Sequence, residues 1–222
     1  MTPADTMSKA ERFLQLDHAR QAAKFLIVLL MKLVTQAKLP FLVTEYSHQM
    51  QQDLGIFLNR YGDSMGRRNA SYTDVMEAVR GFAKAAEAFH FTLNPYPSMD
   101  MLAHQEFNDQ TLDLERAFLL PSFATTRDDT QSLAGRFLDG PYYRQLIYGP
   151  SPLNRRETAF LPRLSAALAV ATTAPPSEKT DKLNWKVVER ELFFVVDSLE
   201  SAKCILDNHL VSPLQSKDHH HL

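Results

Sequence analysis

The side chains best suited to bind an anion stand together near the middle of the chain. Asn154, Arg155 and Arg156 follow one another just before a segment that is expected to be helical. Two guanidinium groups and an amide in this order could clamp a carboxylate, because a guanidinium presents paired N–H donors. The two arginines could instead form ion pairs with Glu157 or with an acidic partner, and the local sequence leaves both interpretations open.

The residues that usually hold zinc or act as nucleophiles are scattered along the chain. No His-Glu-x-x-His or Gly-x-Ser-x-Gly motif occurs, and the run at residues 219–221 resembles a purification tag. Cys204 is the single cysteine and is expected to be a small buried side chain within a helix. We therefore predict no catalytic residue and no metal site in this chain. The other histidines considered are His18, His48, His90, His104 and His209.

One modification signal is present between two predicted helices. Asn69-Ala70-Ser71 forms an N-glycosylation sequon. Asn69 is therefore a glycosylation candidate, on the condition that the chain enters the secretory pathway.

Composition and charge exclude several classes of partner. The chain has 222 residues, of which 45% are hydrophobic and 23% charged, as in ordinary globular proteins. Its net charge of −2 offers no basic surplus for phosphates, so we predict no nucleic-acid partner. The most apolar stretch, residues 25–34, is interrupted by Lys32 and is shorter than the roughly 20 residues that span a bilayer. We therefore predict no membrane contact by this chain.

Apolar residues recur at spacings of three and four, which predicts an all-α protein. The expected helices cover about residues 8–37, 44–61, 73–93, 98–120, 159–172 and 184–209, with exposed loops near 61–68 and 175–182. Residues 144–148 could form one short strand. Antiparallel amphipathic helices joined by short loops favour a bundle. The first helix is apolar on every side over residues 25–31, which is typical of a helix that is buried all round.

The long connection over residues 122–158 does not have the composition of a solvated loop. Its second half contains three tyrosines and the adjacent aliphatic residues Leu146 and Ile147, where a linker would be small and polar. We therefore expect this segment to run across a surface and bury side chains.

Two motifs carry a resemblance to a known family. Leu114-Glu115-Arg116-Ala117-Phe118 is followed by Pro141-Tyr142-Tyr143-Arg144 and by Ile147-Tyr148-Gly149-Pro150-Ser151. This combination resembles the C-terminal domain of the glutamate carboxypeptidase II and transferrin receptor family, the transferrin receptor-like dimerisation domain. The likeness covers about residues 39–206, from Leu39-Pro40-Phe41 to the helix that contains Trp185 and Cys204.

The resemblance implies a four-helix up-and-down bundle that forms homodimers, preceded here by one extra long helix. Residues 1–38 would be a remnant of the last helix of a protease-like domain, residues 39–210 the dimerisation domain, and residues 211–222 a disordered tail. Complete relatives carry a single membrane anchor with this domain extracellular. Their zinc site would precede anything present here. The chain would then hold no cofactor, would lack its partner protease-like domain, and would be a fragment, an isoform or a partial gene product.

The resemblance also assigns a role to the anion-binding candidates. In the carboxypeptidases an Asn-Lys-Tyr stretch grips the substrate's C-terminal glutamate, and Asn154 and Arg155 match its first two positions. Arg156 replaces the tyrosine, which puts the glutamate preference in doubt. Two function classes follow, a non-catalytic dimerisation module and a part of a zinc exopeptidase that supplies substrate-binding residues; a catalytically dead receptor-like relative is a third.

Overall fold

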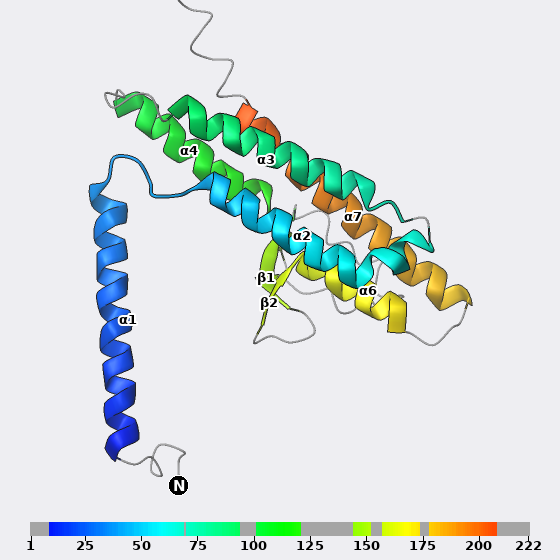
Figure 1. The fold of residues 1–222 in the computed structure, drawn as a ribbon, viewed down its shortest axis with the longest axis horizontal. Coiled ribbons are helices and arrows are strands. Elements are labelled where there is room, and N and C mark those ends of the chain that lie inside the picture. Colours follow the sequence, from blue (N-terminus) through cyan, green and yellow to red (C-terminus); the bar gives the residue numbers. More distant parts are fainter. Residues whose placement is uncertain are drawn as a thin grey trace, which may run out of the picture. The chain divides into compact units, whose positions relative to one another are not determined.

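The protein is a helical bundle with one small β-hairpin, as the computed structural model in Figure 1 shows. The structure describes residues 9–68, 70–93, 101–120, 144–151, 157–173 and 178–207. The predicted all-α helical bundle is confirmed. The helices are α1 (Lys9–Thr35), α2 (Val43–Gly66), α3 (Thr73–Leu93), α4 (Met101–Ala117), α6 (Pro162–Thr173) and α7 (Glu178–Asp207), and the strands are β1 (Tyr148–Pro150) and β2 (Thr158–Phe160).

The chain divides into two compact units, one of residues 1–41 with 99–108 and the other of residues 42–98 with 109–222. In the first unit, the Asn108 side chain binds the segment that follows α1. Its Nδ2 donates to the Ala37 carbonyl at 2.9 Å, and its Oδ1 accepts from the Leu39 amide at 2.9 Å. Asn108 therefore fixes the start of the Leu39-Pro40-Phe41 segment, at which the family likeness begins. The assignment of residues 1–38 to a protease-like domain stays a prediction.

The apolar run of α1 is exposed, so the expected burial on all sides is not observed within this chain. The eight large apolar side chains of this run are between 38% and 82% exposed. None of the described helices is both long and apolar enough to cross a bilayer. The eight side chains are Phe25, Leu26, Ile27, Val28, Leu29, Leu30, Met31 and Val34.

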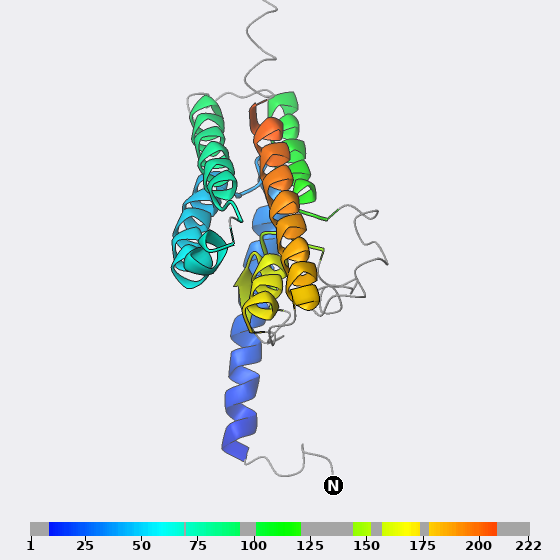
Figure 2. The same cartoon turned by 90° about the vertical axis from the view of Figure 1, so that its right-hand side faces the viewer.

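In the second unit, α2, α3, the part of α4 from Asp109 onward and α7 alternate in direction, as the order of colours along each helix in Figure 1 shows. Helix α3 packs against both α2 and α7, and α6 lies beside α7 (Figure 2). Aromatic rings fill the centre: Phe82 and Phe118 are fully buried with ring centroids 5.8 Å apart, and Tyr46 stacks on Phe118 at 5.7 Å. The core therefore joins α2, α3 and the residue that follows α4 through one aromatic cluster.

The apolar stripe of α2 is buried as predicted, but the helix is longer than predicted. Met50, Leu54, Phe57 and Tyr61 all face the core, and the stripe continues to the fully buried Met65. The predicted loop at Tyr61-Gly62-Asp63 is therefore wrong, since these residues are helical. The burial of Met65 extends the helix past Gly62, whose small entropic disadvantage does not break it.

The last two helices also begin at other residues than predicted. Helix α6 begins at Pro162 rather than near residue 159, and α7 begins at Glu178 rather than near Asn184. The predicted exposed loop to residue 182 is therefore wrong over its last five residues. Here Asp181 pairs with Arg68 at 2.7 Å, which gives this first part of α7 a partner from the α2–α3 turn.

Cys204 is exposed, so the prediction of a buried cysteine is wrong. Its helical neighbours Ala202 and Leu206 are fully buried. Cys204 instead lies on the solvent side of α7, because two residues along a helix turn the side chain by about 200°.

Candidate functional site

The candidate site is the β-hairpin that leads into the predicted anion-binding residues. Strands β1 and β2 pair antiparallel, with Tyr148 opposite Phe160 and Pro150 opposite Thr158. The Ser151 amide donates to the Glu157 carbonyl at 2.8 Å, which closes the base of the loop. Asn154, Arg155 and Arg156 lie in this loop but outside the described residues, as Asn69 does elsewhere. The predicted strand at residues 144–148 overlaps β1 only at Tyr148.

The chain that enters the hairpin is fastened to the end of α4. The Leu146 amide donates to the Phe118 carbonyl at 2.9 Å, and the Leu120 amide donates to the Arg144 carbonyl at 2.7 Å. Gln145 Oε1 accepts from the Ile147 and Tyr148 amides at 2.6 and 2.8 Å. Leu146 and Ile147 are buried, as expected for a segment that runs across a surface and packs against it.

Tyr148 joins the hairpin to α2. Its hydroxyl donates to Asp53 Oδ2 at 2.8 Å, and Gln49 Nε2 donates to the other oxygen of Asp53 at 3.1 Å. Burial, and next the hydrogen bond with Asp53, raise the pKa of Tyr148 far above its ordinary value. The phenol therefore keeps its proton at physiological pH and serves as a permanent donor to Asp53.

The turn from β2 into α6 is held in a conformation that few residues adopt. Leu161 has a φ of 47°, in the left-handed region, and its side chain is buried. Its amide donates to the Ile147 carbonyl at 2.8 Å, and Ser165 Oγ donates to the Phe160 carbonyl at 2.9 Å. Pro162 then begins α6 at the first helical position, which suits proline. Burial of Leu161 offsets the backbone strain of this turn.

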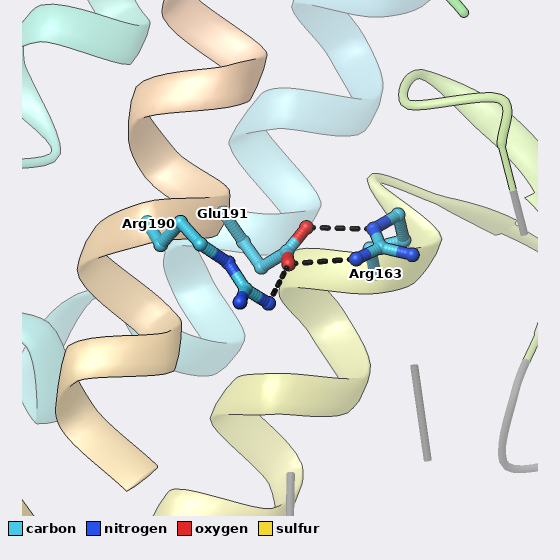
Figure 3. A network of polar contacts seen from close by, with 3 residues as sticks. All are labelled: Arg163, Arg190 and Glu191. Carbon is cyan, nitrogen blue, oxygen red and sulfur yellow. Dashed lines mark hydrogen bonds and ion pairs between the residues drawn. The ribbon is translucent and has the colours of Figure 1, made fainter. Parts of the chain in front are cut away.

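A buried ion network fastens α6 to α7 directly after this turn (Figure 3). Arg163 donates from Nε and Nη2 to the two oxygens of Glu191 at 2.7 and 2.9 Å, and Arg190 Nη2 adds a contact at 2.8 Å. The Arg163 and Glu191 side chains are 4% and 0% exposed. A cation in the first turn of a helix opposes the helix dipole, and the Glu191 carboxylate offsets that effect. The network therefore fixes the register between α6 and α7.

A cavity of about 300 Å³ lies between the hairpin and α2. Helix α2 contributes Asp53, Ile56, Phe57, Arg60 and Tyr61 to its wall. The hairpin and the start of α6 contribute the rest, namely Ser151, Glu157, Thr158, Ala159, Phe160 and Ser165. The cavity thus borders both ends of the loop that contains the predicted anion-binding residues.

Within the described ranges, no three His, Cys, Asp or Glu side chains gather in a way that could hold a metal ion. A catalytic zinc site requires three protein ligands and an open position. The described residues therefore do not fit a zinc ion.

Reasoning from the sequence missed the residues that position the hairpin. Asp53 and Tyr148 are 95 positions apart, so no local pattern could pair them. The sequence did indicate that Glu191 is buried, because this residue lies between Val188 and Val195 on the apolar face of a predicted helix. A charged residue at such a position requires a buried partner, and that partner is Arg163.

The chain has distant homologues among aminopeptidases. Aminopeptidase NAALADL1 of Rattus norvegicus is 29% identical over 209 residues, which cover 92% of this chain and 25% of that protein. The Mus musculus protein of the same name is 27% identical over the same shares. The chain spans about a quarter of the length of these curated relatives. No protein-family profile matches the chain.

The alignment with these aminopeptidases includes both units of the chain. The unaligned remainder is under a tenth of the chain, which is shorter than the 27 residues of α1. The alignment therefore reaches into α1 as well as the bundle. The resemblance to the glutamate carboxypeptidase II and transferrin receptor family is supported to the extent that these distant homologues are peptidases.

Proposed function

We propose that this chain is the helical dimerisation domain of a glutamate carboxypeptidase-like peptidase and is not catalytic by itself. Its distant homologues are named aminopeptidases and are about four times as long. The names of these relatives favour the peptidase branch over a catalytically dead receptor-like protein. In this proposal, zinc and the catalytic groups belong to the protease-like domain of a complete relative.

The hairpin loop is proposed to contribute substrate contacts through Asn154, Arg155 and Arg156. The observation that carries this proposal is the construction of the hairpin base, which is hydrogen-bonded to α2, to the segment directly after α4 and to its own turn. Substrate-binding groups need rigid support, because a misplacement of about 1 Å weakens binding and catalysis strongly. A firmly held base next to two arginines therefore suits the recognition of an anionic peptide terminus.

The loop proposal is tested by titrating the full chain with a peptide that ends in glutamate and with its C-terminal amide. We expect the free carboxylate to bind at least about tenfold more tightly, since a charge-assisted pair is replaced by a neutral contact. The double substitution Arg155→Ala with Arg156→Ala should abolish this difference. The matched control, Arg80→Ala with Lys84→Ala on α3, should preserve it. Equal binding of the two peptides by the unaltered chain would refute the loop assignment.

Dimerisation is tested by sedimentation at micromolar concentration, where a dimer mass is expected. The exposed face of α7 is proposed to contribute, because Phe193 is 64% exposed there. A self-complementary apolar patch is the usual interface of a homodimer. Phe193→Glu should yield monomers, whereas Phe91→Glu on α3, at a phenylalanine that is 72% exposed, should remain dimeric. A monomer mass for the unaltered chain at all concentrations would contradict this assignment.

Absence of catalysis is tested by incubating the chain with an acidic dipeptide, with and without added zinc. We expect no hydrolysis in either case. Release of glutamate that a chelator abolishes would show that this chain carries a complete peptidase site.

A further inference from the structure

The cavity between α2 and the hairpin combines an apolar wall with charged groups of both signs. Phe57 and Phe160 meet edge to face with centroids 6.3 Å apart, and Tyr61 lies 5.2 Å from Phe57. Ile56 stands beside these rings and is 67% exposed. An apolar group that entered the cavity would contact the rings and remove part of Ile56 from water.

The charged groups of α2 lie along the same wall as the apolar side chains. Asp53 and Arg60 are seven residues apart, so about 10 Å of helix axis separates their backbones. Both oxygens of Asp53 already accept one hydrogen bond, from Gln49 and Tyr148, and a carboxylate has about four acceptor sites. It can therefore accept further donors. Arg60 lies 5.3 Å from the Tyr61 ring, and its guanidinium retains donors for a carboxylate.

We propose that this cavity binds a short zwitterionic peptide, of about two residues, with an apolar side chain. The peptide's ammonium group binds Asp53, its carboxylate binds Arg60, and its side chain lies on Ile56, Phe57 and Phe160. Extended chain spans at most about 3.5 Å per residue, so a dipeptide spans about 7 Å, and the long Arg60 side chain can cover the rest of the roughly 10 Å of helix axis between the two residues. A cavity of about 300 Å³ is at the small end of ligand sites, which suits a dipeptide.

This site is separate from the loop residues Asn154, Arg155 and Arg156, and it does not depend on their proposed role. The loop was assigned to one anionic terminus, whereas this cavity would recognise both charges of a small free peptide. The two proposals can therefore fail independently. A chain that binds dipeptides only through Arg155 and Arg156 would retain the loop assignment and lose this one.

The test is a titration of the full 222-residue chain with leucylleucine, followed by amide chemical shifts. We expect a dissociation constant of about 1 mM, with shifts of the Ser151, Ala159 and Ser165 amides. N-acetyl-leucylleucine, which lacks the ammonium group, and leucylleucine amide, which lacks the carboxylate, should each bind about tenfold more weakly. Equal binding of all three peptides, or no shift at these amides, would overturn the proposal.

Variants of α2 provide the second arm of the test. Arg60→Ala should weaken leucylleucine binding about tenfold and leave the binding of its amide unchanged, because the amide lacks the group that Arg60 recognises. Arg60 is exposed, so its replacement should not unfold the helix. Arg80→Ala on α3 is the matched control and should bind as the unaltered chain does. If Arg60→Ala affects both ligands equally, or neither, the assignment of Arg60 to the carboxylate is wrong.

Discussion

Helices α1 and α7 are of similar length, but α1 exposes its large apolar side chains and α7 buries most of its own. Helix α1 has 27 residues and leaves Phe25, Leu26 and Ile27 more than half exposed. Helix α7 has 30 residues and buries Val188, Val195 and Leu199 almost completely. In α7 the apolar residues recur at spacings of three and four, so they form one face. In α1 they are consecutive and form no single face.

The comparison shows that the arrangement of apolar residues, and not their number, decides what a helix can bury in this chain. A helix with one apolar face needs neighbours on that side only. The apolar face of α7 packs against α3 and α6. That face even accommodates a carboxylate, Glu191, because two arginines surround it. A helix that is apolar all round needs neighbours on every side.

The largest expected effect follows from removing the carboxylate that α7 buries. Glu191→Ala should lower the free energy of unfolding by about 3–5 kcal/mol, since it removes the buried carboxylate to which Arg163 donates two hydrogen bonds. Replacing both residues, as Arg163→Met with Glu191→Leu, should recover most of that loss because no charge is left buried. Urea denaturation of the three chains provides the measurement. A loss below about 1 kcal/mol for the single variant would show that α7 does not depend on the ion network.

One leucine-to-alanine substitution on each helix allows a direct comparison of how much the two helices contribute to stability. Leu199→Ala on α7 should lower the free energy of unfolding by about 2–5 kcal/mol, because it leaves a cavity at a fully buried position. Leu30→Ala on α1, at a side chain 58% exposed, should change it by less than about 0.5 kcal/mol. Both are measured in urea under the same conditions. Equal losses would mean that α1 is buried in solution and that the contrast does not hold.

Removing α1 tests the same contrast at the scale of a whole helix. A chain of residues 36–222 retains Ala37 and Leu39, which Asn108 binds. We expect it to scatter less light and bind less hydrophobic dye than the full chain, because an exposed apolar run promotes self-association. Its melting temperature should change by only a few degrees. A drop of more than about 10 °C would make α1 an integral part of the fold, since that corresponds to several kcal/mol for a chain of this size.

Much of the bundle could be predicted from the sequence because its helices repeat apolar residues at helical spacing. The stripe from Met50 to Tyr61 placed α2 correctly, although its end was missed. Gly62 and Asp63 have the composition of a turn, and only the burial of Met65 shows that the helix continues. Tertiary packing thus outweighed local propensity at this helix end. The same holds at the start of α7, where the pairing of Asp181 with Arg68 involves residues far apart in sequence.

The candidate site was predictable only in part. Composition singled out the segment around Tyr148 as one that buries side chains, and the resemblance named Asn154, Arg155 and Arg156. The partner of Tyr148, Asp53, could not be found, because it lies on a different helix and looks like an ordinary exposed acid of α2. The left-handed Leu161 also left no trace in the sequence, since leucine is not a residue that signals this conformation.

A smaller effect concerns an amide buried on α7. Asn184 is fully buried, and among the described residues neither polar atom of its side chain has a hydrogen-bond partner. Asn184→Leu should therefore raise the free energy of unfolding by about 1 kcal/mol, because an unpaired buried amide is removed. The matched change on α1, Gln21→Leu, should alter it by less than about 0.5 kcal/mol, since Gln21 is exposed. A loss of stability in Asn184→Leu would indicate that a water molecule or another group binds this amide.

An effect of similar size is expected at the rim of the bundle, where Tyr148 binds Asp53. Tyr148→Phe should lower the free energy of unfolding by about 1 kcal/mol at pH 7, since it removes one hydrogen bond and keeps the ring. Tyr72→Phe is the control at this pH and should have a smaller effect.

The pH dependence of the same variant tests the cause of the interaction. Because burial raises the pKa of folded Tyr148 above the unfolded value of 10.0, the folded state holds this proton more tightly than the unfolded state. Its contribution to stability is therefore complete below pH 10 and is lost as the pH rises through the folded pKa. Urea denaturation between pH 7 and about pH 11 should show a steeper fall in stability for the unaltered chain than for Tyr148→Phe. Parallel curves would mean that the phenol ionises equally in both states, and that Tyr148 is open to water, as the residues of α1 are.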